Sequence, residues 1–301
     1  MPPGTQTDEL ERTFGRASAI SFTASGLGGP VAHLAAQGNS VTIALQGAQV
    51  LSWRHRGVEQ LWLSPVARLG DVRPVRGGVP VCWPWFSAHP EDPTKPSHGF
   101  VRTLAWQVAA TTHGRSPEHA SITLTFETRP EHAGLWPHSA RAELTVRLDD
   151  GLSLRLETTN TGAAPLVLSE ALHTYFAVGD IGEVVIRGLE NVDFIDTLDG
   201  HAIKRHGDPI RIDAEIDRIY IGDTRAIELD DQARRIAITS KGSASTVVWN
   251  PWIAKTQRLG DLGAPDAYRR MMCVETTNAG SDRILLESGQ RHALEARYDI
   301  A

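Results

Sequence analysis

The chain has 301 residues, 41% of them hydrophobic and 22% charged, which is an ordinary globular composition that one large all-β domain can accommodate. Its formal net charge of -6 offers no general attraction for nucleic acid or an anionic membrane, so we expect neither as a partner. No apolar run is long enough for a membrane helix and no signal peptide is evident, so we expect a cytoplasmic protein, and we expect it to be a monomer. The two cysteines lie far apart in the sequence and form no CxxC pair, so we expect reduced thiols.

In chain order, the first predicted element is a short helix at residues 8–15. It lies in a segment, residues 1–18, that we expect to be a loosely attached extension of one domain formed by residues 19–301. The rest of the chain is dominated by an apolar period of two, which is typical of strands. The strands predicted in this way lie at residues 39–46, 121–128, 143–148, 152–157, 234–240, 245–250 and 292–300.

The turn between two of these strands is the clearest local signal. Asp149, Asp150 and Gly151 separate two alternating runs, which indicates a β-hairpin. A second short helix is predicted at residues 264–272. Many short strands with glycine and proline turns predict an all-β protein, a large antiparallel β-sandwich with a few short helices.

Several familiar catalytic motifs are absent from the sequence. It has no glycine-rich phosphate loop, no HExxH or CxxC metal motif and no GxSxG nucleophile motif. We therefore expect no cofactor and no metal, and a site built from ordinary acids, bases and hydrogen-bonding groups.

The segment "RGGVPVCWPWFSAHPEDPTKPSHGFVR" concentrates arginines, indoles and a histidine in one stretch. Arg76 precedes a pair of glycines, and His98 lies four residues before Arg102. If the chain is extended there, that even spacing directs both side chains to one face. Taken singly, each residue has a simpler explanation as a surface arginine or a loop histidine.

Three other polar residues lie within apolar runs: His173 in "ALHTYF", Asp217 in "EIDRIY" and Glu275 at the end of "MCVE". A histidine in such a run is most often a satisfied core residue. A carboxylate after an apolar strand is costly to bury unpaired, which makes Glu275 the most suggestive of the three.

These motifs occur in one order: "RGGVPVCWPWF", "HGFVR", "ALHTYF", "EIDRIY", "VVWNPW" and "MCVE". In that order they resemble the hexose-6-phosphate mutarotases, or glucose-6-phosphate 1-epimerases, of the aldose 1-epimerase superfamily. The resemblance covers residues 51–275 and implies the galactose mutarotase-like sandwich, in agreement with the period of two. It also implies an isomerase that interconverts the α and β anomers of a hexose 6-phosphate.

The resemblance implies a role for each candidate residue. His173 corresponds to the general acid and Glu275 to the general base, while His98 and Asp217 correspond to residues that bind the sugar. Arg76 and Arg102 correspond to the arginines that bind the phosphate group.

Mutarotation requires only proton transfers, from the anomeric hydroxyl and to the ring oxygen, so one base and one acid are enough. We expect a nearby carboxylate to raise the pKa of the histidine and keep it protonated. The planar guanidinium fork of arginine suits a phosphate, with which it can form two parallel charge-assisted bonds.

Two alternatives stay open. The protein could be a mutarotase for unphosphorylated aldoses, in which Arg76 and Arg102 do not face the ligand. It could also be a carbohydrate-binding module without activity, although such a module has no need of both His173 and Glu275. The charged loop at residues 87–97 could alter which sugar enters the site.

Overall fold

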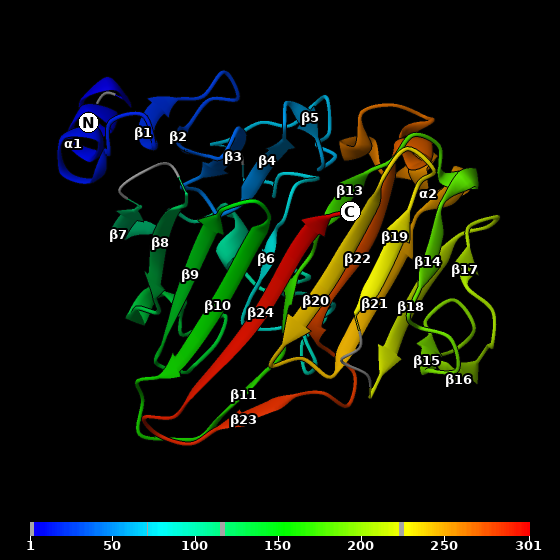
Figure 1. Ribbon diagram of the computed structural model, residues 1–301. Coiled ribbons are helices and arrows are strands. Elements are labelled where there is room, and N and C mark those ends of the chain that lie inside the picture. Colours follow the sequence, from blue (N-terminus) through cyan, green and yellow to red (C-terminus); the bar gives the residue numbers. More distant parts are fainter. Residues whose placement is uncertain (1–2, 71, 115–117, 223–225) are drawn as a thin grey trace.

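The protein is built from antiparallel sheets, as the alternating sequence predicts (Figure 1). The computed structural model describes residues 3–70, 72–114, 118–222 and 226–301. Two large sheets pack face to face and enclose the main hydrophobic core, which confirms the predicted all-β sandwich with few short helices.

The first large sheet has nine strands in the spatial order β17-β14-β19-β20-β24-β10-β9-β8-β7. It contains the predicted hairpin, in which Leu148 of β9 lies opposite Leu152 of β10. The Asp149 carboxylate accepts a hydrogen bond from the Gly151 amide within the turn. The nine strands are β7 (Gln107–His113), β8 (Ala120–Glu127), β9 (Ala140–Leu148), β10 (Leu152–Asn160), β14 (Val185–Arg187), β17 (Ile210–Arg211), β19 (Ile227–Asp230), β20 (Arg235–Lys241) and β24 (Arg291–Ile300).

The second large sheet has eight strands, seven of them in the order β16-β15-β18-β21-β22-β12-β6. The eighth, β13, pairs with β22 further along the same edge that β12 occupies. The eight strands are β6 (Val81–Cys82), β12 (Glu170–Leu172), β13 (Tyr175–Ala177), β15 (Asp193–Asp196), β16 (Ala202–Arg205), β18 (Ile216–Ile221), β21 (Ser245–Asn250) and β22 (Met271–Asn278).

Two smaller sheets and a few helices complete the described fold. The five-stranded sheet follows the chain in the order β1 to β5, and the two-stranded sheet pairs β11 with β23. The five 3₁₀ turns lie at residues 101–103, 130–132, 181–183, 260–262 and 267–270. The remaining elements are α1 (Pro3–Phe14), β1 (Ile20–Ala24), β2 (Pro30–Ala36), β3 (Asn39–Ala44), β4 (Val50–His55), β5 (Val58–Glu59), β11 (Leu166–Leu168), α2 (Trp252–Arg258) and β23 (Ile284–Leu286).

Helix α1 covers most of the helix predicted at residues 8–15. Its Leu10 and Phe14 pack against the main core, and its Glu11 carboxylate accepts a hydrogen bond from the Phe22 amide of β1. These contacts tie the helix to the five-stranded sheet. The division of the chain into an extension and a single domain stays a prediction.

The helix predicted at residues 264–272 is wrong for most of its length. Only Ala267–Arg270 form a 3₁₀ turn, and Met271 and Met272 already belong to β22, where they pair with Ala177 and Phe176 of β13. Backbone pairing with a neighbouring strand overrides the local helical pattern here. Helix α2 was not predicted from the sequence.

Strand β22 separates the two sides of the eight-stranded sheet, and all eight of its residues are buried. Met272 and Val274 belong to the core between the large sheets, where β24 lies against β22 (Figure 1). Cys273 belongs to a second apolar cluster on the other face, together with Tyr175 and Trp249. The strand therefore alternates between the core and the face that carries the candidate site.

Glu170 of β12 is a buried carboxyl group on the core side of this sheet. Its Oε2 accepts a hydrogen bond of 3.1 Å from Thr158 of β10, while its buried Oε1 has no hydrogen-bond partner among the described residues. The Nε2 atom of His292 lies 3.8 Å from Oε1. Burial raises the pKa of Glu170 to about 8, so the folded protein keeps this carboxyl group protonated at neutral pH.

We expect Glu170→Gln to reduce the loss of stability as pH rises. Between the ordinary carboxyl pKa and about 8, the unfolded chain releases the Glu170 proton and the folded chain retains it. Proton binding by the folded state makes the free energy of unfolding decrease as pH rises through this window, by at most about 1.4 kcal/mol per pH unit. Urea unfolding of both proteins from pH 5 to 8 measures the difference, and parallel curves would contradict it.

Candidate active site

A pocket of about 430 Å³ lies on the face of the eight-stranded sheet that is turned away from the main core. This volume is large enough for a small ligand. Five of the six predicted site residues line it, although they are separated by up to two hundred positions in the chain. These five are Arg76, His98, His173, Asp217 and Glu275.

His173 and Glu275 lie next to one another because of strand register. Leu172 of β12 pairs with Thr276 of β22, and Tyr175 of β13 pairs with Cys273. The same register carried across the gap between β12 and β13 places His173 opposite Glu275. In this gap the Thr174 amide donates to the Leu172 carbonyl instead of to β22, and the His173 amide donates to the Pro80 carbonyl on the opposite side.

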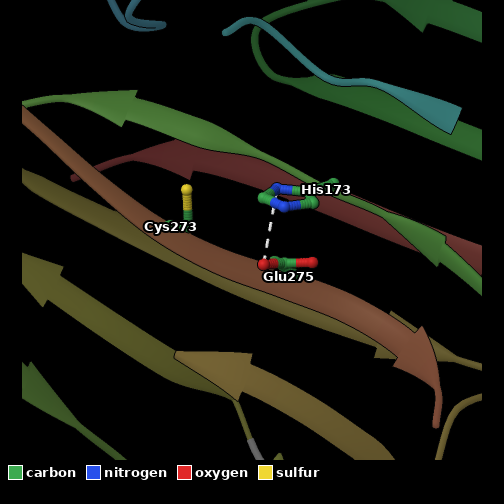
Figure 2. Close-up of side chains that lie close together, drawn as sticks. All are labelled: His173, Cys273 and Glu275. Atoms are coloured by element: carbon green, nitrogen blue, oxygen red, sulfur yellow. Dashed lines mark ion pairs between the residues drawn. The ribbon is translucent and has the colours of Figure 1, made fainter. Parts of the chain in front are cut away.

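The two side chains face each other with His173 Nδ1 3.4 Å from Glu275 Oε1 (Figure 2). Only 7% of the histidine and 1% of the glutamate is exposed. Neither His173 Nδ1 nor Glu275 Oε2 has a hydrogen-bond partner among the described residues, although both atoms are buried. Buried polar atoms without partners are rare in folded proteins and are frequent where a ligand is to bind.

Aromatic rings fix the plane of the His173 imidazole. The ring stacks on Tyr175, with centroids 4.7 Å apart and planes inclined by 6°. Trp249 and His98 meet it edge-on, at 6.1 Å and 5.6 Å. This packing holds the plane of the imidazole, and in that plane Nδ1 lies beside the Glu275 carboxyl group.

The protonation of the pair differs from the expectation drawn from sequence. Burial lowers the pKa of His173, and the positive charges of Arg76 and Arg102 and the nearby His98 lower it further. Burial raises the pKa of Glu275, with a contribution from the negative charge of Asp217. The predicted rise in the histidine pKa is therefore wrong, because burial and the neighbouring His98, Arg76 and Arg102 lower that pKa.

His98 enters the pocket from a tight turn. His98 and Gly99 both have positive φ, and a Cβ at Gly99 would lie 1.8 Å from the Trp83 carbonyl oxygen, so only glycine fits there. His98 Nδ1 accepts a hydrogen bond from the Ser87 amide, which leaves the ring proton on Nε2. Burial, together with the two arginines, lowers the pKa of His98 to about 3, so it is a neutral hydrogen-bond donor.

Arg76 is held by two partners. Its Nε and Nη2 donate to one Asp261 oxygen at 3.0 Å and 2.7 Å, and its Nη1 donates to the Tyr175 hydroxyl at 3.0 Å. A guanidinium has five N–H groups, so two remain for a ligand. Asp261, which offsets part of this positive charge, was not identified from the sequence.

Arg102 lies beside the pocket rather than among the residues that line it. The prediction that His98 and Arg102 share one face of an extended segment is wrong, because Arg102 belongs to a 3₁₀ turn, Val101–Thr103. Its Nη2 donates to the Ser97 carbonyl, and its buried Nε has no partner in the described parts of the chain. Arg102 nevertheless lies close enough to lower the pKa of both site histidines.

Asp217 of β18 reaches the pocket from the strand next to β21. Its carboxylate lies 3.8 Å from Lys255 Nζ, which also forms a 2.9 Å ion pair with Glu215. Lys255 lines the pocket from helix α2 and lies 5.8 Å from the centre of the Trp249 ring. Lys255 lies three residues after the "VVWNPW" motif and was not predicted from the sequence.

The charged loop at residues 87–97 forms one wall of a neighbouring groove of about 580 Å³. This groove shares five lining residues with the pocket: Phe86, Ser87, Thr197, His201 and Ile219. Lys95 lines this groove. An effect of the loop on sugar preference stays a prediction.

Among the described residues, no helix is long and apolar enough to cross a membrane.

The large antiparallel sandwich that carries this pocket has the galactose mutarotase-like fold, and the protein is an isomerase of the epimerase class. The sequence pattern of the family described as aldose 1-epimerase matches residues 30–299, and the chain belongs to this family.

Similar proteins agree with this assignment. A protein of Cenchrus ciliaris, provisionally named a glucose-6-phosphate 1-epimerase, is 34% identical over 77% of this chain and 73% of its own. One of Escherichia coli K12 with the same provisional name is 32% identical over 85% of both chains. The crystal structure of a provisionally named mutarotase from Salmonella typhimurium superposes with a TM-score of 0.87, at 25% identity, over 98% of this chain and 99% of that one.

Proposed function

We propose that the protein interconverts the α and β anomers of a hexose 6-phosphate, and therefore acts as a glucose-6-phosphate 1-epimerase. The observation that carries the proposal is the buried His173–Glu275 pair in a pocket beside two arginines. The provisional names of the relatives from Cenchrus ciliaris and Escherichia coli support the same substrate class.

The reaction follows from the positions of the two side chains. Glu275 accepts the proton of the anomeric hydroxyl as His173 donates a proton to the ring oxygen, so the C1–O5 bond breaks and an aldehyde forms. Rotation about the C1–C2 bond exposes the other face of the aldehyde, and the reverse transfers close the ring. Both oxygens are bonded to C1, so an acid and a base 3.4 Å apart can reach them from one side.

The phosphate group accounts for the positive charges around the pocket. Arg102 forms no ion pair with a carboxylate among the described residues, and its buried Nε–H has no hydrogen-bond partner there. Burying an unpaired, charged donor costs free energy, and a bound anion would offset this cost. Arg76 and Lys255 line the pocket and supply further donors. A dianion bound here would offset the positive potential at His173 and so favour the protonated imidazole in the substrate complex.

The experiment that tests this proposal compares Arg102→Ala with the wild-type protein on glucose 6-phosphate and on free glucose. A hydrogen bond to a charged group contributes about 1.5–3 kcal/mol, so kcat/KM for glucose 6-phosphate should fall about ten- to a hundredfold. Free glucose lacks the phosphate contact and should lose little. Anomer exchange measured by NMR gives all four rates.

Two further variants sharpen the comparison. Arg102→Lys restores the charge without the planar fork, so we expect partial rescue on glucose 6-phosphate. Arg129→Ala removes an arginine whose side chain is 63% exposed and which lies outside the pocket, and it should change neither rate. Equal losses on both sugars would instead favour a mutarotase for unphosphorylated aldoses, and no exchange with either sugar would favour a binding module.

The proposal extends to the compartment, the oligomeric state and the cofactor requirement of the protein. We infer a cytoplasmic monomer that binds a small sugar phosphate and requires neither a metal nor a nucleotide. The two buried, unpaired cysteines, Cys82 and Cys273, support a reducing compartment.

A further inference from the structure

Cys273 adds a third potential ligand to the acid–base pair. Its sulfur, a nitrogen of His173 and a carboxylate oxygen of Glu275 all lie within 4.8 Å of one another. Figure 2 shows the three side chains on the same side of β22, with the cysteine sulfur level with the imidazole. Cys273 and Glu275 are two residues apart on one strand, so both point toward His173.

We propose that His173, Cys273 and Glu275 bind one zinc-like divalent cation, and that this cation inhibits the enzyme by occupying its acid and its base. Thiolate, imidazole and carboxylate form the mixed donor set that zinc accepts, whereas magnesium and calcium prefer oxygen donors alone. The inhibitory part of the proposal rests on the function proposed above, and the binding part does not.

The surroundings of the three side chains fit such an ion. Ligand atoms around a tetrahedral zinc lie roughly 3.3–3.8 Å apart, as follows from zinc–ligand bonds of about 2.0–2.3 Å, so a closure of about 1 Å would complete the site. The unpaired Nδ1 of His173 and Oε2 of Glu275 are buried polar atoms that an ion would satisfy.

The three ligands can balance the charge of a dication, and this balance is needed because Arg76 and Arg102 contribute positive charge at His173. Binding displaces the thiol proton of Cys273 to solvent, so one thiolate, one carboxylate and one neutral imidazole cancel the two charges of the ion. A net charge of zero matters because the cysteine is fully buried and the glutamate nearly so. His173 and Glu275 line the pocket, so water or a sugar hydroxyl can supply a fourth ligand from that side.

Binding is tested first, without reference to activity. Cobalt(II) added to the metal-free protein should bind one equivalent and give the near-ultraviolet charge-transfer absorption of a thiolate ligand. The band should disappear in Cys273→Ser and persist in Cys82→Ser, which removes the other buried free cysteine. A band that is absent from the wild-type protein, or that is lost only in Cys82→Ser, would overturn the proposal.

Inhibition is tested second, by anomer exchange with zinc, with magnesium and with excess chelator. Zinc should inhibit the wild-type protein, chelator should restore the full rate, and magnesium should have no effect. Loss of an outer-shell partner weakens metal binding about ten- to a hundredfold, so loss of the Cys273 ligand should raise the inhibitory zinc concentration at least tenfold.

The cobalt-binding test and the zinc-inhibition test distinguish failure of the metal site from failure of the proposed epimerase function. Zinc inhibition of the same strength in wild type and Cys273→Ser would overturn the metal site while leaving the epimerase activity in place. A cobalt–thiolate band in a protein without anomer exchange would support the site and contradict the proposed function. Because zinc binds sugar phosphates, each variant is compared with wild type in the same mixture.

Discussion

Replacing Glu275 by glutamine should lower the rate of anomer exchange at least about a hundredfold, which is the usual effect of losing a general base. Glutamine has nearly the same shape as glutamate, so β22 should keep its pairing and the pocket its form. It cannot accept the proton of the anomeric hydroxyl, and the ring then opens only as fast as water allows. NMR exchange spectroscopy on glucose 6-phosphate measures the rate directly.

The chain offers a matched control for this variant. Glu170 is also a fully buried glutamate in the same sheet, with a histidine, His292, 3.8 Å away. Its carboxyl group bonds to Thr158 between the two large sheets, on the face away from the pocket. Glu170→Gln should therefore leave anomer exchange unchanged, and a Glu275→Gln protein with near wild-type rates would remove Glu275 from the mechanism.

Replacing His173 by asparagine should have an effect of similar size, because the ring oxygen is a poor leaving group without a proton. Binding of glucose 6-phosphate should survive, since the groups proposed to hold the phosphate, Arg76, Arg102 and Lys255, are unchanged. Exchange rates and calorimetric titration with the sugar phosphate, measured on one preparation, separate chemistry from binding.

The control for this variant is His292→Asn, which removes a mostly buried histidine on the core side of the sheet. Exchange should be retained there if the protein folds, which circular dichroism can verify. A His173→Asn protein with weaker binding and unchanged turnover of bound substrate would make His173 a positioning residue, and the acid would have to be sought elsewhere.

Much of the fold could be predicted from sequence because a sheet with one face in a core has a strict period of two. The hairpin of β9 and β10 is a local pattern of this kind, since buried and less buried residues alternate along both strands. Helix α2 was not predicted because it is only seven residues long. Met271 and Met272 lie in a locally helical pattern but form part of β22, because they pair with β13. Neither fact is visible in a local window.

The site shows a similar limit. The family resemblance suggested His173 as an acid and Glu275 as a base, but the contact between them depends on the register of β12, β13 and β22. The direction of the histidine pKa depends on Arg76 and Arg102, which lie at least 71 positions away in sequence. Sequence reasoning therefore suggested which groups take part, but it could not give the balance of burial and charge around them.

The length of the gap between β12 and β13 limits how this site can change during evolution. His173 meets Glu275 because it directly follows Leu172, which pairs with Thr276, so one residue inserted between Leu172 and His173 would itself lie opposite the glutamate. Substitutions elsewhere on the pocket wall leave this alignment intact. We therefore expect the pocket wall to accept new side chains, and hence new sugars, while the length of the chain between Leu172 and Tyr175 stays constant.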